Sequence, residues 1–191
     1  MEIDVYKGNE NIFLILTGIG GSTKGFQNKY VNLSRKINEK YGFTAFVVST
    51  ESGVWNDERK YFDKVINEVS SYINMMKINV KKIFAMGTSA GANLLIHNAH
   101  RYNAIKKILA INFLFNVNYN LFQDFIKEYE GMATLIVGER DSSYTFFDIL
   151  NKYKSERIRV ISIPNADHNF ADMLNTYLEL PEKYLFKDDM K

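Results

Sequence analysis

The residues Gly87-Thr88-Ser89-Ala90-Gly91 have the types and spacing needed for a nucleophilic serine. They follow a short apolar run at 82–86 and precede a segment with helical character that extends to Arg101. A Gly-x-Ser-x-Gly sequence between a strand and a helix is typical of a sharp turn that exposes the serine hydroxyl. The turn is so tight that the flanking positions have almost no room for side chains. We therefore predict that Ser89 attacks a carbonyl carbon.

A serine hydroxyl is a poor nucleophile near neutral pH unless a base accepts its proton. The chain has three histidines, and two of them, His97 and His100, fall on the helix expected after Ser89, too far along it to reach back. We expect both to be partly exposed helix residues. His168 lies between the last predicted strand and the last predicted helix, at the sheet edge where loops converge on a ligand. His168 is therefore the predicted base.

The base requires a carboxylate on its far ring nitrogen, which fixes the tautomer and stabilises the imidazolium. Asp141 closely follows the apolar run at 135–138, so we expect it at the same sheet edge as Ser89 and His168. Three rival carboxylates lie too close to the strand, next to the histidine or on the last helix: Glu139, Asp167 and Asp172. The alternative for Asp141 itself is a helix N-cap.

An acyl-transfer site also needs backbone N–H groups that bind the developing oxyanion. Ala90 follows the predicted nucleophile, and its N–H lies at the positive end of a helix. The second donor is expected from the glycine-rich loop 17–22, where the backbone can approach a substrate closely. Ile19 is the first choice for this donor and Gly20 the second.

Strands alternate with helices along the whole chain, which predicts a parallel sheet with helical crossovers. The first strand, 3–6, is expected to form a hairpin with the second through the turn 7–11. The other predicted strands are 12–16, 43–49, 83–86, 105–111, 133–138 and 157–163, and the predicted helices are 26–41, 59–76, 90–101, 119–129, 146–153 and 170–184. No composition shift divides the chain, so one domain is expected over 1–191.

The composition, 46% hydrophobic and 24% charged residues over 191 positions, is ordinary for a globular protein. The net charge of +2 includes no basic stripe, so nucleic acid is not an expected partner. The absence of cysteine excludes disulfides, thiol catalysis and thiolate metal sites, and we expect no metal or other cofactor. No leader-like segment and no membrane-spanning run is visible, which favours a cytoplasmic protein. The composition is also compatible with a homodimer.

The chain order Ser89, Asp141, His168, with a glycine-rich loop after the first core strand, resembles the α/β-hydrolase superfamily. The resemblance covers nearly the whole chain and implies a three-layer α/β fold: a mostly parallel sheet of about seven strands, an antiparallel N-terminal edge strand, and helices on both faces. Thr17 stands where many relatives have histidine. Only about 20 residues separate the strands at 105–111 and 133–138, which leaves no room for a cap domain and predicts an open, shallow site.

The resemblance implies a serine hydrolase that cleaves a small-molecule ester or thioester through an acyl-enzyme on Ser89. The same residues would permit acyl transfer to another acceptor or peptide hydrolysis, and a hydrolase-like binding protein without activity is a further alternative. Trp55, Phe113 and Phe115 follow two strands at the expected edge and are weak candidates for substrate contacts.

A different class of enzyme, the short-chain dehydrogenases, has similar residues. Glycines at 18, 20 and 21 follow the first apolar strand, and Tyr102 and Lys106 form a Tyr-x-x-x-Lys pair beyond Ser89. However, Thr23 stands where the dinucleotide-binding pattern needs its third glycine. The predicted helix also ends near Tyr102, whereas the pair needs one continuous helical turn. We therefore favour the hydrolase.

Overall fold

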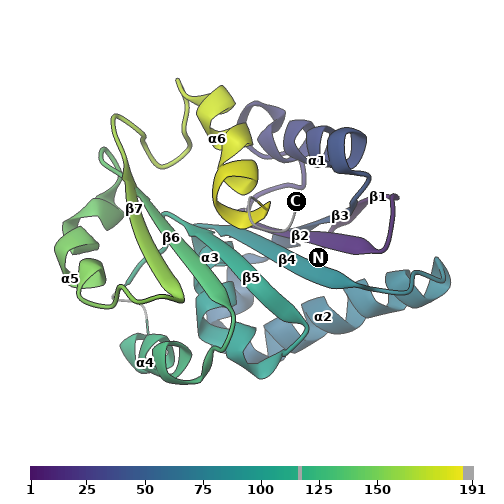
Figure 1. The fold of residues 1–191 in the computed structure, drawn as a ribbon, viewed down its shortest axis with the longest axis horizontal. Helices are drawn as coiled ribbons and strands as arrows, with labels where there is room; N and C mark the ends of the chain where they lie inside the picture. Colours follow the sequence, from purple (N-terminus) through teal and green to yellow (C-terminus); the bar gives the residue numbers. More distant parts are fainter. Residues whose placement is uncertain (116–117, 187–191) are drawn as a thin grey trace.

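The computed structural model describes residues 1–115 and 118–186, and a seven-stranded sheet forms its centre (Figure 1). The strand order is β1-β3-β2-β4-β5-β6-β7. The strands are β1 (Ile3–Tyr6), β2 (Asn11–Ile19), β3 (Thr44–Thr50), β4 (Lys82–Thr88), β5 (Ile105–Ile111), β6 (Met132–Gly138) and β7 (Ile158–Ile163). All neighbouring strands pair in parallel except β1, which is antiparallel to β3 at one edge. The predicted fold class is confirmed.

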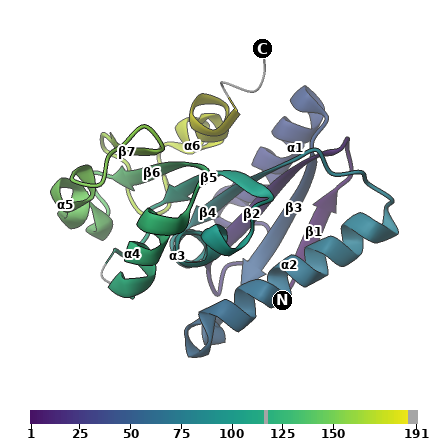
Figure 2. The same cartoon turned by 60° about the horizontal axis from the view of Figure 1, so that its bottom comes forward.

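Helices cover both faces of the sheet (Figures 1 and 2). The helices are α1 (Lys29–Tyr41), α2 (Glu58–Met75), α3 (Ala90–Asn98), α4 (Tyr119–Glu128), α5 (Phe147–Asn151) and α6 (Leu174–Pro181). α1 and α6 lie on one face, and α2, α3 and α4 lie on the other, with α5 beside β7. The sheet and its two helical layers therefore form the three predicted layers.

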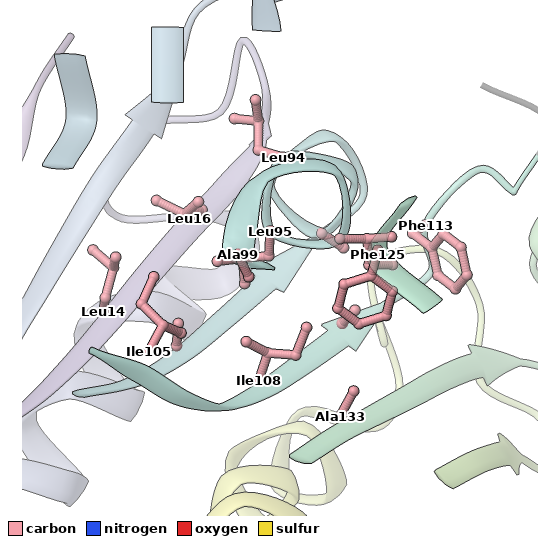
Figure 3. Close-up of a cluster of buried hydrophobic side chains, with 14 of the residues drawn as sticks. Leu14, Leu16, Leu94, Leu95, Ala99, Ile105, Ile108, Phe113, Phe125 and Ala133 are labelled. Atoms are coloured by element: carbon pink, nitrogen blue, oxygen red, sulfur yellow. The ribbon is translucent and has the colours of Figure 1, made fainter. Parts of the chain in front are cut away.

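The central strands are apolar on both sides because both of their faces are covered. In β2, Phe13 and Ile15 belong to the core beneath α1 and α6. Their neighbours Leu14 and Leu16 point the opposite way, into the core beneath α2, α3 and α4 (Figure 3). The strict alternation of a strand thus divides one continuous apolar run between two cores.

The predicted hairpin between the first two strands is wrong, because β3 lies between β1 and β2. The connection instead crosses the end of β3, where the Asn9 N–H donates to the Gly42 carbonyl (2.5 Å) and the Gly8 N–H donates to the Thr44 hydroxyl (3.0 Å). A Cβ on Gly8 would lie 2.2 Å from the Gly42 oxygen, so this crossing requires glycine. Turn residues between two apolar runs do not distinguish a hairpin from a crossing.

Two predicted boundaries differ in ways that affect the site. β2 continues to Ile19, so the first part of the glycine-rich segment is strand rather than loop. The last helix begins at Leu174 instead of 170, because Phe170 has a φ of 57° and cannot belong to a right-handed helix. A longer loop therefore carries His168.

The described residues between β5 and β6 form a single helix, α4, and contain no cap domain. Within residues 1–115 and 118–186, no helix is both long enough and apolar enough to cross a membrane.

Candidate active site

Ser89 occupies a sharp turn between the last residue of β4 and the first residue of α3. Its φ of 56° and ψ of −120° lie in a region that side chains disfavour. Two backbone hydrogen bonds hold the turn: the Ser89 N–H donates to the Ile111 carbonyl (2.8 Å), and the Asn93 N–H donates to the Ser89 carbonyl (3.0 Å). The fold thus maintains a strained conformation at this position.

The flanking glycines are required by direct backbone contacts. A Cβ on Gly87 would lie 2.4 Å from the Gly91 carbonyl oxygen. A Cβ on Gly91 would lie 2.3 Å from the Leu16 carbonyl oxygen, because the start of α3 packs directly against β2. Both distances are far shorter than a van der Waals contact, and the opposing atoms are backbone that cannot rotate away. The Gly-x-Ser-x-Gly pattern therefore has a structural cause.

The structure brings Asp141 and His168 together, with 2.5 Å between Asp141 Oδ2 and His168 Nδ1. The Asp141 side chain is buried, while 46% of the His168 side chain is exposed. Burial raises the pKa of Asp141, but hydrogen bonds from His168 and from Ser143 outweigh this effect and leave the pKa below its ordinary value. Asp141 is therefore an anion at neutral pH that faces one nitrogen of a partly exposed imidazole. Its other oxygen accepts the Ser143 N–H (2.7 Å), so the predicted N-cap role is also filled.

The rival carboxylates make other contacts. Asp167 accepts the N–H groups of Asn169 and Ala171, both at 3.0 Å, and so stabilises the turn beside the histidine. Glu139 accepts the Ser162 hydroxyl at 3.3 Å. Asp172 is exposed to solvent.

Asn112, which the sequence analysis missed, holds the loop that carries His168. It follows β5, is fully buried and has a φ of 50°. Its Nδ2 donates to the carbonyls of Asp167 (3.3 Å) and His168 (3.2 Å), and its Oδ1 accepts the Gly138 N–H (2.8 Å). One amide thus joins the ends of β5 and β6 to the histidine loop. The available signal was a polar residue directly after an apolar strand.

The other two histidines lie away from Ser89, as predicted, but the expected exposure of His97 is wrong. His97 is 1% exposed, and its Nδ1 lies 2.5 Å from Glu58 Oε2 on α2. The His100 side chain is also largely buried, with 6% of it exposed, and lies 3.6 Å from Glu128. His97 therefore joins α2 to α3 as a buried polar pair, which the apolar residues around it on α3 did not reveal.

Ser89 and His168 line the same cavity, which has a volume of about 210 Å³ and includes Gly18, Ile19 and Gly21. A Cβ on Gly18 would lie only 3.6 Å from the Ser89 Cβ, so the end of β2 lies directly beside the serine. No hydrogen bond between the Ser89 hydroxyl and His168 occurs among the described residues. A larger hollow of about 610 Å³ lies along α2 and includes none of the three predicted catalytic residues.

The backbone donors expected around Ser89 differ in their availability. The Gly20 N–H already donates to the Thr50 carbonyl on β3, at 2.8 Å. Ile19, the last residue of β2, lines the cavity beside Ser89 and is the other candidate from this segment. Ala90 is the first residue of α3, so its N–H has no partner within the helix.

The floor of the cavity is polar although it is buried. The hydroxyls of Thr88 and Tyr177 lie 2.9 Å apart. Burial raises the pKa of Tyr30, partly offset by hydrogen bonds with Thr88 and the Gly18 backbone. Lys29, at the start of α1, also lines the cavity, and burial lowers its pKa to about 8 despite the nearby Asp167. The sequence analysis missed these residues, because a lysine in the first turn of a helix is usually exposed.

The aromatic residues predicted as weak substrate contacts lie elsewhere. Phe113 and Phe115 are buried, 1% and 7% exposed, and both pack against Phe122 of α4. Both belong to the hydrophobic core on the side of α2, α3 and α4, in which Figure 3 shows Phe113. Trp55 is 38% exposed and does not line the cavity at Ser89.

The dehydrogenase-like pair is also separated from the serine. Tyr102 precedes β5, at the amino end of the strands, and its hydroxyl donates to Asp63 of α2. Ser89 lies at the opposite, carboxyl end of β4.

Across residues 1–115 and 118–186, no group of three or more potential metal ligands among His, Cys, Asp and Glu comes together.

No protein-family model matches the chain, and no curated protein matches it. Solved structures do. Est1E from Butyrivibrio proteoclasticus superposes with a TM-score of 0.76 at 15% identity, over 99% of this chain and 93% of that one. Dienelactone hydrolase from Anabaena variabilis gives a TM-score of 0.72 at 16% identity, over 97% and 89% of the two chains.

XC6422 from Xanthomonas campestris, described as an α/β serine hydrolase without a lid, gives a TM-score of 0.70 at 16% identity, over 95% of this chain and 86% of that one. Likeness at such low identity establishes the fold and leaves the activity to be argued from the site. The chain therefore has the fold of the capless α/β hydrolases.

Proposed function

We propose that the protein is a serine hydrolase that cleaves a small-molecule ester or thioester through an acyl-enzyme on Ser89. The observation that carries the proposal is the buried Asp141 carboxylate bonded to His168, beside a cavity that the histidine shares with a serine in a strained turn. Strained backbone conformations and buried carboxylates with shifted pKa values are concentrated at functional sites.

In the first step, Ser89 Oγ attacks the substrate carbonyl carbon and His168 Nε2 accepts the hydroxyl proton. Asp141 keeps the proton of His168 on Nδ1 and stabilises the imidazolium that forms. Collapse of the tetrahedral intermediate breaks the bond to the leaving group, and His168 returns the proton to that alcohol or thiol. Water then attacks the acyl-enzyme by the same sequence, which releases the acid and restores Ser89.

The N–H groups of Ala90 and Ile19 bind the oxyanion in both steps. Ala90 begins α3, so the positive end of the helix adds to its hydrogen bond. Ile19 is favoured over Gly20, because the Gly20 N–H is engaged with Thr50. Removal of one such donor typically lowers the turnover number by about a hundredfold or more.

The missing hydrogen bond between Ser89 and His168 is compatible with this mechanism. Catalytic hydrogen bonds are commonly long or absent before substrate binds and form in the complex. The His168 side chain is 46% exposed and lines the cavity, and its Nδ1 faces Asp141, so Nε2 is the ring nitrogen left for the Ser89 proton. A rotation of the Ser89 side chain about χ1 changes the position of Oγ without moving the backbone.

The test is labelling by a fluorophosphonate probe, followed by intact-mass analysis, together with hydrolysis of p-nitrophenyl butyrate and a matched acyl thioester. We expect one adduct on the folded protein and none on Ser89→Ala. The control is Ser70→Ala, which removes an exposed serine from α2, away from the cavity, and should leave labelling and turnover unchanged. Unlabelled folded protein would favour a binding protein, and full ester turnover by Ser89→Ala would exclude the mechanism.

A further inference from the structure

Lys29 is a buried lysine in the cavity that contains Ser89 and His168. Only 3% of the residue is exposed, and it lines the cavity from the start of α1. Lysine is almost never buried to this extent unless a partner compensates its charge. The contacts of the ammonium group therefore indicate whether the fold itself supplies that compensation.

The fold compensates the Lys29 charge only in part. Its Nζ donates to the Asn169 carbonyl at 3.4 Å and lies 4.8 Å and 5.4 Å from the ring centres of Tyr177 and Tyr30. These neutral groups attract a cation but do not cancel its charge. No carboxylate lies within ion-pair distance of Lys29 among the described residues. The nearest acidic influence, Asp167, has one oxygen engaged with two backbone N–H groups and raises the Lys29 pKa by less than burial lowers it.

The rest of the cavity adds positive potential. The described residues that line it include no aspartate or glutamate, and the Asp141 carboxylate behind His168 is bonded to the His168 Nδ1 and the Ser143 N–H. Two helices, α1 and α3, begin at the cavity, and the first turn of neither helix contains an acidic residue. The positive ends of both helix dipoles therefore add to the charge of Lys29. An anionic group in this cavity would gain a charge-assisted hydrogen bond and relieve the desolvation of the ammonium group.

We propose that Lys29 makes the site selective for small esters that carry a carboxylate a few bonds from the scissile carbonyl. This inference rests on the proposed function, because it names the substrate class of the same site. The carboxylate can belong to the acyl part, as in a hemi-ester of a short dicarboxylic acid, or to the alcohol part, as in an acylated hydroxy acid. The ammonium group binds this anion while Ser89 attacks the ester carbonyl.

The first experiment measures binding without turnover, by calorimetry on the Ser89→Ala protein. Monoethyl succinate is compared with diethyl succinate, and acetoxyacetate with its ethyl ester, so that the two pairs distinguish the acyl side from the alcohol side. We expect the anion of at least one pair to bind about tenfold to a hundredfold more tightly than its neutral partner, the usual range for a hydrogen bond to a charged group.

Lys29→Met on the same background should remove this difference, because methionine keeps an apolar stem of similar length without the charge. Lys36→Met is the matched control: the same change, on the same helix, at a lysine that contacts Glu182 instead of the cavity. A purely structural role for Lys29, through the Asn169 carbonyl, would weaken the binding of charged and neutral esters equally.

Equal affinity of the anionic and neutral esters for Ser89→Ala would overturn the inference, and this comparison needs no Lys29 variant. A preference that Lys29→Met retains would overturn it as well. Neither result bears on catalysis, because turnover and probe labelling of the unaltered enzyme are measured separately. Failure of the proposed function and failure of the anion site are therefore distinguishable.

Discussion

Replacement of Ser89 by glycine should make the protein more stable than replacement by alanine. Both variants lack the hydroxyl, so neither should hydrolyse an ester. They differ in the Cβ atom. This atom makes φ 56° and ψ −120° sterically unfavourable for alanine, whereas glycine adopts these angles without steric conflict. The comparison therefore isolates the backbone strain at the turn.

The expected difference follows from two opposing terms. A side-chain-bearing residue in such a region costs about 1–3 kcal/mol. Glycine loses about 0.5–1 kcal/mol more conformational entropy on folding than alanine does. The net prediction is that Ser89→Gly is about 1 kcal/mol more stable than Ser89→Ala, which corresponds to a rise in Tm of about 2–4 °C for a chain of this size.

Urea unfolding, followed by circular dichroism, measures this difference at equilibrium. The control pair is Ser70→Gly and Ser70→Ala, at an exposed position of α2, where glycine should be about 1 kcal/mol less stable than alanine. The sign of the effect should therefore reverse between the two sites. If Ser89→Gly were no more stable than Ser89→Ala, the turn would hold no strain at this residue.

Three further predictions concern the same region. Asp141→Asn should lower kcat/KM for p-nitrophenyl butyrate by about 10⁴-fold, as loss of the orienting carboxylate does in a Ser-His-Asp triad. Asp172→Asn, at one of the exposed rival carboxylates, should leave kcat/KM unchanged. Equal rates for both variants would contradict the role of Asp141. Gly91→Ala should lower the free energy of unfolding by about 3 kcal/mol, because its Cβ would lie 2.3 Å from a β2 carbonyl oxygen. The control Gly53→Ala, whose Cβ would have its nearest neighbour 3.7 Å away, should stay within about 0.5 kcal/mol of wild type. Similar unfolding midpoints of the two variants in urea would show that α3 can move away from β2. Because the pKa of Lys29 is lowered to about 8 in the folded protein, the unfolded chain binds more protons above that pH, so stability from this group should rise between about pH 8 and 10.5. If the urea midpoint of Lys29→Met changed with pH over this window as much as the wild-type midpoint does, the burial of the charge would be contradicted.

The sequence was sufficient to predict the sheet and the meeting of Asp141 with His168. Apolar runs and helical spacing define a parallel sheet, and all parallel strands have their carboxyl ends at the same edge. A residue directly after a strand therefore has a known position even when its partners are far away in the chain. This reasoning selected Asp141 over Glu139, whose side chain contacts Ser162 instead.

Features that depend on packing could not be predicted in this way. The hairpin prediction for β1 failed because a short connection can turn back beside its own strand or cross the end of a neighbour. Phe113 also follows a strand, but α4 covers it, and its spacing did not indicate which side of the loop it faces. Lys29 resembles any lysine at a helix start, and only the positions of Tyr30 and Tyr177 show that its charge is buried.

The residues with unfavourable backbone angles provide an independent indication of the site. Among residues 1–115 and 118–186, the non-glycine residues with positive φ, apart from Lys77 and Asn118, lie at the carboxyl edge of the sheet or in the segment that leads into Lys29: Gln27, Asn28, Ser89, Asn112, Asn165 and Phe170. Four elements contribute them, so no single turn explains the cluster. A fold selected for stability alone would place glycine at several of these positions. Ser89 lines the cavity itself, and Asn112 holds the loop that carries His168. Side chains retained at such angles in these positions are what is expected where function and stability conflict.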